Sequence, residues 1–469
     1  CSRFKSCLLV GLALVSVGLL AGGRKAYGYA AIGLMAVFLV AQVLVERGLI
    51  SRVLNRVPRM AAAQPGGALG LRVAARRLAA RVARMEPWLL IVLIPFLMFP
   101  NAVTPVLVPL LVLPWLARKM AKGHFGERTP AGGAVVVLVA MLVVSIGVSP
   151  DIQRSTPKFY GIVLGVAAYY AIVNAVRREK DVWIVAGLLA AAGVAMSLLA
   201  LVGTNWPVGK HTGLLLLARA LPRLIGVAPG VLQRGFHPNE VGAALTLFIP
   251  LVVSLVLSTW RTSQPTSNPI RWLVLILLTL ALVLMVGTLA LTQSRSAWVG
   301  ITIAVLLIIP LERRWTGRAP VLLVLSAATA LTILGLRSIE PLIALLPEYS
   351  VPRVQIWQRA LAMIRESPHT GIGLNAFPVV TAATDRWLPI ASERLLELTH
   401  AHNVFLQVAV DMGMPGLVGY LAVLIAFGAA AYSVYRRSAP GPSRAICVGL
   451  VCAMLAYHVY GLTDCMTLG

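Results

Sequence analysis

Long apolar runs alternate with short polar connections along the whole chain. A transmembrane helix needs about 20 mostly apolar residues, and scanning on that basis predicts about thirteen spans. They cover residues 7–22, 27–45, 87–100, 102–117, 131–148, 159–176, 182–203, 239–259, 272–292, 297–311, 319–336, 403–434 and 445–463. The short, proline-interrupted pair at 87–117 is either two tilted spans or a re-entrant hairpin. We therefore expect an all-α polytopic membrane protein with about 12–13 transmembrane helices.

Composition supports this prediction and excludes other classes. The chain of 469 residues is 59% hydrophobic and 12% charged, with a mean hydropathy of +0.86. A soluble domain is about 45–50% apolar and about 25% charged, so a soluble enzyme, a disordered chain and a disulfide scaffold are excluded. The five cysteines lack metal-ligand spacing. We expect no cleavable signal peptide at 8–20, because a second apolar segment follows without a clear cleavage site.

The strong basic excess has two readings. A net charge of +25 could indicate a nucleic-acid partner. In a polytopic protein, however, Lys and Arg collect in cytoplasmic loops. With a cytoplasmic N-terminus, every short inner connection is basic, so we favour the topological reading and expect no nucleic-acid partner.

The predicted spans and two long polar stretches divide the chain into four parts. Residues 1–203 hold N-terminal spans and, at 47–86, a basic amphipathic segment that is typical of a helix lying on anionic lipid. Residues 204–336 hold central spans with an outer loop and turn. Residues 337–402 form a long, partly helical extracytoplasmic loop with a Gly-x-Gly turn. Residues 403–469 hold the C-terminal spans.

Polar residues gather at four places on the predicted outer boundary of the membrane. These places are 233–240, 292–298, 351–359 and 400–407. Ionisable groups at span ends on one face are candidates for function. Three arginines, Arg234, Arg295 and Arg353, suit phosphate oxygens because the guanidinium group is a permanently charged fork of donors. Membrane snorkelling, a loop salt bridge and simple solvation remain alternatives for them.

The histidines supply a candidate base. His402 lies at the start of a predicted span, and an imidazole suits proton abstraction from a hydroxyl. His400 and His237 are weaker candidates. Asn403 could contact substrate or simply cap the helix. No spacing in the sequence indicates a metal site, so we expect a cofactor-free site in which arginines neutralise a lipid pyrophosphate while a histidine activates a hydroxyl.

Several motifs resemble the O-antigen ligase family. His402-Asn403 followed by Gly413 and Gly416 is similar to the family signature. The family's long outer loop is similar to Arg353-Val-Gln-Ile-Trp357, Met363-Ile364, Pro368 and Gly371-Ile-Gly373, and further likeness lies in Gln293-Ser-Arg-Ser-Ala297 and Phe236-His-Pro-Asn239. The resemblance covers roughly 234–420. The family's usual even number of spans differs from the odd number counted here.

The resemblance implies a GT-C-like glycosyltransferase in the bacterial inner membrane, with its active site on the periplasmic face. It implies a metal-independent, inverting transfer of a glycan from undecaprenyl pyrophosphate to an acceptor hydroxyl, such as a lipid A-core sugar. His402 would be the base, and Arg295 and Arg353 would hold the pyrophosphate, with Arg234, His237 and Asn403 in support. Membrane lipids complete the expected partners.

Two alternatives stay open. A polysaccharide polymerase of the same superfamily would use the same donor and base. A lipid-linked glycan transporter would instead place ionisable groups near the membrane midplane, in two corresponding halves. The gathering of polar groups at one face favours an enzyme.

Overall fold

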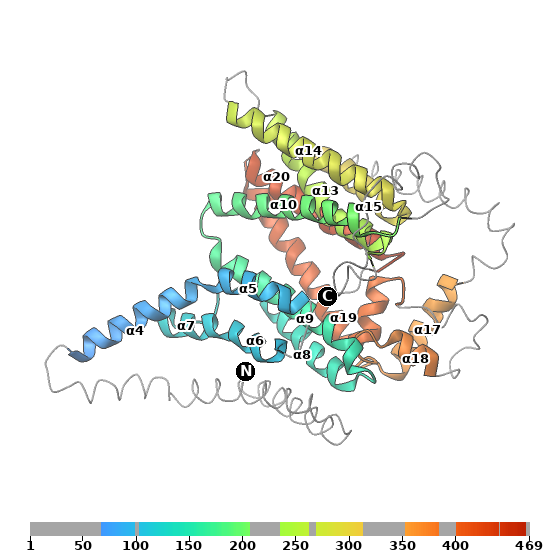
Figure 1. Cartoon of the computed structure of the whole chain (residues 1–469), viewed down its shortest axis with the longest axis horizontal. Helices are drawn as coiled ribbons and strands as arrows, with labels where there is room; N and C mark the ends of the chain where they lie inside the picture. The colour runs from blue at the N-terminus through green and yellow to red at the C-terminus, as the bar shows by residue number, and fades with distance from the viewer. Residues whose placement is uncertain are drawn as a thin grey trace.

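The computed structural model describes residues 67–98, 103–206, 235–261, 269–312, 352–383, 400–439 and 441–465. Within these ranges every regular element is a helix (Figure 1). The elements are α4 (Gly67–Arg84), α5 (Glu86–Met98), α6 (Thr104–Leu107), the 3-10 helix η1 (Val108–Leu111), α7 (Val112–Lys122), α8 (Gly132–Val148), α9 (Ile152–Ala175), α10 (Glu179–Gly203), α13 (Pro238–Arg261), α14 (Pro269–Thr292), α15 (Arg295–Glu312), α17 (Pro352–Glu366), α18 (Phe377–Ala383), α19 (Val404–Arg437) and α20 (Pro442–Gly461).

The expected all-α polytopic membrane class is confirmed. Among the described residues, eight helical segments are long and apolar enough to cross a membrane. They are Thr104–Lys122, Ile152–Ala175, Glu179–Gly203, Pro238–Arg261, Pro269–Thr292, Arg295–Glu312, Val404–Arg437 and Pro442–Gly461. α8 is a shorter apolar helix of 17 residues, and α5 has 13 residues. The predicted spans at 7–22, 27–45 and 319–336 lie outside the described residues.

One group of helices packs around α13, the most deeply buried span described. α10, α14, α15 and α20 surround it in the upper part of Figure 1. Two glycines allow close helix approach. A Cβ added at Gly300 of α15 would collide with the carbonyl oxygen of Ala456 in α20, and one at Gly449 of α20 would lie 2.9 Å from Cα of Leu251 in α13. Their lack of a side chain thus fixes α20 between α13 and α15.

A second group joins α8, α9 and the first half of α19 to the loop at 367–376. Gly413 has φ 69 and ψ −179, so the long α19 bends there. Two backbone hydrogen bonds join the loop to the residues that flank the bend. Ile372 N–H donates to the Val410 carbonyl at 2.8 Å, and Met414 N–H donates to the Pro368 carbonyl at 2.7 Å. The residues on either side of Gly413 therefore anchor the loop at 367–376, which follows α17.

The two ends of the bundle differ in charge. One end gathers basic side chains of described residues, namely Arg177, Arg178, Lys180, Arg261, Arg271, Arg436, Arg437 and Arg444. Buried Arg444 donates to the Leu311 carbonyl at 2.7 Å and stacks on Tyr435. The opposite end brings together the N-termini of α9, α13, α15 and α19 and the C-termini of α8, α10, α14 and α20, and it carries the histidines considered below.

Of the amphipathic segment predicted at 47–86, residues 67–84 form the helix α4. Four of its arginines, Arg76, Arg77, Arg81 and Arg84, are exposed, while Ala79 and Ala83 are buried against α7. The helix therefore presents one basic face and one packed face. Residues 47–66 lie outside the described part.

Candidate active site

Four helix ends meet at one place through polar contacts. Ser296 in the first turn of α15 lies 2.7 Å, hydroxyl to hydroxyl, from Thr463, which follows α20. The Asn403 side-chain amide before α19 donates to the Leu462 carbonyl at 3.1 Å. Asn239 at the start of α13 donates to the Asp464 carboxylate at 2.8 Å. The turn at 462–464 thus links α13, α15 and α19.

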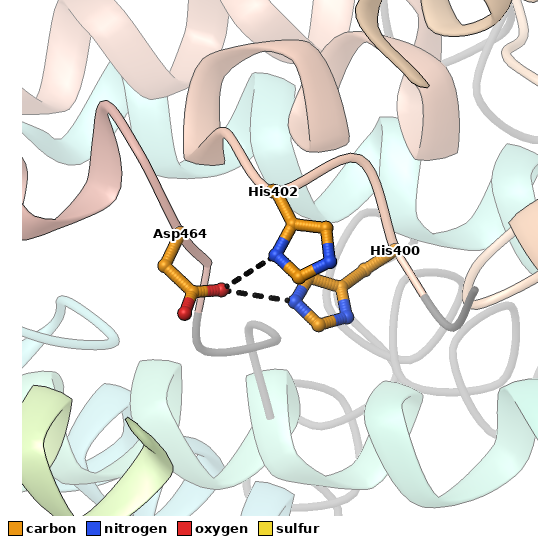
Figure 2. Close-up of side chains that lie close together, drawn as sticks. All are labelled: His400, His402 and Asp464. Atoms are coloured by element: carbon orange, nitrogen blue, oxygen red, sulfur yellow. Dashed lines mark hydrogen bonds and ion pairs between the residues drawn. The ribbon is translucent and has the colours of Figure 1, made fainter. Parts of the chain in front are cut away.

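Asp464 is the centre of this junction. Its Oδ1 atom lies 3.0 Å from Nδ1 of His402 and 3.2 Å from Nε2 of His400, and Figure 2 shows both rings directed at that single oxygen. The two rings lie against each other with centroids 4.2 Å apart. The carboxylate also accepts the Cys465 N–H at 2.9 Å. Its side chain is 5% exposed, whereas that of His402 is 25% exposed.

The surroundings keep Asp464 ionised. Burial acts to raise the pKa of the carboxyl, but the hydrogen bonds from His400 and His402 outweigh it and hold the pKa well below the usual range. A carboxylate fixed in this state accepts an N–H from Nδ1 of His402. The lone pair of that imidazole is then on Nε2, which Figure 2 shows on the side of the ring away from Asp464. This arrangement suits His402 for proton abstraction.

The local backbone of His402 is strained. The residue has φ 48, in the left-handed region that a side chain bearing Cβ rarely adopts. Such a conformation costs about 1–3 kcal/mol and persists where surrounding contacts impose it. Asn403 supplies one of these contacts, because its side-chain oxygen accepts the N–H groups of Phe405 and Leu406 and so caps α19. Asn403 thus caps α19, which was one of the two roles expected for it. Its side-chain NH₂ group also links it to the Leu462 carbonyl after α20.

The structure brings some predicted residues together. Arg295, the first residue of α15, is exposed beside Ser296, so it lies at the same junction as His402. His237 is exposed, and its Nδ1 accepts the Asn239 N–H at 3.2 Å. Asn239 in turn donates to Asp464, so His237 is linked to Asp464 through Asn239. The backbone of Arg353 belongs to α17, but its side chain lies outside the described part of the structure, as does the whole of Arg234.

Asp464 is the residue that sequence reasoning missed. Only 16 acidic residues occur in the chain, and this one directly follows an apolar span. An ionisable group at the end of a span is itself a candidate for function. The histidine spacing could not reveal it, because the carboxylate comes from a segment 62 residues later in the chain.

His400, His402 and Asp464 also form a donor set able to hold a metal ion. One ligand atom from each lies within 4.8 Å of the others. Two imidazoles and a carboxylate are ligands that zinc and related metals accept. The sequence-based expectation of no metal rested on linear spacing, which cannot detect a ligand so distant along the chain. That expectation remains a prediction.

The geometry agrees with a comparison to known protein families. Residues 280–421 match the family described as O-antigen ligase. The matched segment runs from within α14 into α19 and includes Arg295, His402 and Gly413. No curated protein matches the chain. This match supports the resemblance to the O-antigen ligase superfamily over residues 280–421 of the chain.

Proposed function

We propose that this protein transfers a glycan from a polyprenyl pyrophosphate, of the undecaprenyl class, to an acceptor hydroxyl at the outer face of the bacterial inner membrane. The observation that carries the proposal is the His402–Asp464 pair at the helix junction where the exposed residue Arg295 begins α15. One group can take a proton and the other can neutralise a phosphate, at the same end of the bundle.

The chemistry follows from these roles. Nε2 of His402 takes the proton of the acceptor hydroxyl as its oxygen attacks the anomeric carbon of the donor sugar. The bond from that carbon to the pyrophosphate oxygen breaks, and the pyrophosphate leaves with the electron pair. Arg295, with Arg353 and Arg234 assigned the same role from the sequence, neutralises the leaving charge. A single displacement of this kind inverts the anomeric configuration and needs neither metal nor nucleotide.

The charge distribution supports the outer location. Basic side chains crowd the end of the bundle opposite to His402. Lys and Arg favour the cytoplasmic side of short membrane connections, so the end that bears His402 faces outward. A lipid-linked donor already carried across the membrane reaches the site from that side.

The acceptor distinguishes a ligase from a polymerase. We favour ligation to a lipid A-core sugar or another surface acceptor, and the same residues would serve a polymerase whose acceptor is a second glycan repeat. His237 and Asn403 lie close enough to the junction to influence either acceptor.

Purified protein tests the proposal directly. It is incubated with a synthetic polyprenyl-pyrophosphate oligosaccharide in the presence of EDTA and without nucleotide. One arm contains lipid A-core and a second contains only additional donor. A conjugate in the first arm supports a ligase, and chain extension in the second supports a polymerase. The absence of product in both arms, or movement of intact donor across liposomes, would overturn the proposal.

A further inference from the structure

A buried ion pair is linked through Gln407 to the histidine segment, residues 400–403. Nζ of Lys158 in α9 lies 2.6 Å from Oδ2 of Asp411 in α19, and their side chains are 3% and 2% exposed. Apolar residues of similar size commonly replace a buried ion pair without loss of stability. Stability alone is therefore a weak reason for placing two charges inside this membrane protein.

The second oxygen of Asp411 continues the contact toward the active site. Oδ1 accepts a hydrogen bond from Nε2 of Gln407 at 2.8 Å. Oε1 of Gln407 in turn accepts the N–H of Ala401 at 2.7 Å. Ala401 is fully buried and lies between His400 and His402. A three-residue chain thus connects Lys158 to the backbone of the histidine segment.

The hydrogen bonds from Ala401 to Gln407 and from Gln407 to Asp411 allow only one orientation of the Gln407 amide. The backbone N–H of Ala401 can only donate, so the Gln407 amide must turn its NH₂ group toward Asp411. Its carbonyl oxygen then necessarily faces the Ala401 N–H. Nζ of Lys158 donates to the other carboxylate oxygen of Asp411 and so holds this side chain in place to accept from Gln407.

The hydrogen bond from Ala401 to Gln407 constrains the strained backbone at His402. His402, directly after Ala401, has φ 48, and the left-handed conformation needs contacts that impose it. Gln407 holds the preceding peptide, while Asn403 ties the following residue to the Leu462 carbonyl. Together they set the distance between the His402 ring and Asp464.

Asp411 of the same ion pair also contacts α8 and the loop at 367–376. The Asp411 carbonyl accepts the Ser145 hydroxyl from α8, and its carboxylate accepts the backbone N–H of Asn375. The pair therefore holds α8, α9, the loop at 367–376 and the histidine segment in one arrangement.

We infer that Lys158, Asp411 and Gln407 form a positioning relay that holds His402 in its reactive geometry. None of the three touches the reacting atoms. The inference rests on the proposed function insofar as His402 is the base, and it adds three residues that determine how well that base is placed.

Two matched double variants test the relay. In K158M/D411N both charges are absent, but the carbonyl of the introduced amide side chain can still accept from Gln407. In K158M/D411L both charges are also absent, and that acceptor is lost. We expect K158M/D411N to keep kcat within about threefold of the wild type. We expect K158M/D411L to lose roughly 10–100-fold in kcat, with KM for the donor unchanged within about threefold.

A local measurement supplements the activity assay. Hydrogen exchange of a peptide containing residues 400–403 should be faster in K158M/D411L than in K158M/D411N. Gln407→Leu, which leaves the ion pair in place, should match K158M/D411L in kcat and in exchange. Equal kcat and equal exchange in the two double variants would overturn the relay. Absence of transfer by the wild type would instead contradict the proposed function and leave the exchange comparison as the test of positioning.

Discussion

Nδ1 of His402 lies 3.0 Å from Oδ1 of Asp464, although the two residues belong to different helix ends. The carboxylate fixes the orientation of the imidazole and stabilises the positive charge that the ring gains when it accepts a proton. Burial in the protein strengthens both effects, since few waters screen a carboxylate that is 5% exposed. The pair therefore holds in place the imidazole that we propose as the base.

Asp464→Asn should reduce transfer while preserving the shape of the side chain. The neutral amide cannot stabilise an imidazolium ion, and it can present an N–H group to Nδ1 in place of an acceptor. We expect kcat to fall by about 10²–10⁴-fold. Steady-state kinetics with the synthetic donor measure the change, and Asp151→Asn, at a partly exposed residue that caps α9, is the control. Equal kcat in Asp464→Asn and the wild type would rule out the carboxylate as the partner of the base.

Arg295→Ala should weaken donor use. Its guanidinium group is exposed at the junction, and a hydrogen bond to a charged group contributes about 1.5–3 kcal/mol. We expect KM for the pyrophosphate donor to rise about 10–100-fold, with a smaller change in KM for the acceptor. Arg295→Lys should recover part of the loss, since it keeps the charge without the fork of donors. The control is Arg437→Ala at the opposite end of the bundle, and an equal effect of both alanine variants would refute the assignment.

Added Co²⁺ or Zn²⁺ should bind the set formed by His400, His402 and Asp464 and inhibit transfer. A metal would occupy the nitrogen that faces Asp464 and remove the carboxylate from the imidazole. Tag-free protein titrated with Co²⁺ should show one visible absorption band at about one equivalent. His400→Ala should lose the band, whereas His369→Ala, at an exposed histidine outside the set, should keep it. A band that survives His400→Ala would place the metal elsewhere.

Gly413→Ala should destabilise the protein. Gly413 has φ 69, and an added Cβ would lie 2.7 Å from the carbonyl carbon of His369. We expect a loss of about 1–3 kcal/mol in the free energy of unfolding, seen as a lower midpoint of thermal unfolding in detergent. Gly428→Ala, in the same helix with open space around its Cβ position, should be neutral or slightly stabilising. Similar midpoints for the two variants would contradict the account of the α19 bend.

The hydrophobic pattern predicted the helices better than the contacts among them. Apolar runs are local, so the spans at 182–203, 239–259, 272–292 and 297–311 correspond closely to α10, α13, α14 and α15. α9 begins at Ile152 rather than at 159, because its first turns carry polar side chains that hydropathy excludes. Those turns contain Lys158, whose charge is neutralised inside the protein and not by water.

The candidate site was predictable only where its residues are close in sequence. His400, His402 and Asn403 lie in one segment, and Arg295 lies in a short turn at the same predicted boundary. Asp464 and Asp411 escaped notice because their partners come from distant helices, and linear spacing carries no such information. Scoring each acidic residue in or beside an apolar span would have identified both.

The central claim is that His402 activates the acceptor at a site that binds the donor independently of it. Parallel measurements on wild-type protein and His402→Ala test this claim most directly: glycan transfer, and equilibrium binding of the pyrophosphate donor in the same detergent. We predict that the variant binds the donor within about threefold of the wild type and transfers glycan at least about 10²-fold more slowly. Transfer at the wild-type rate by His402→Ala would contradict the account.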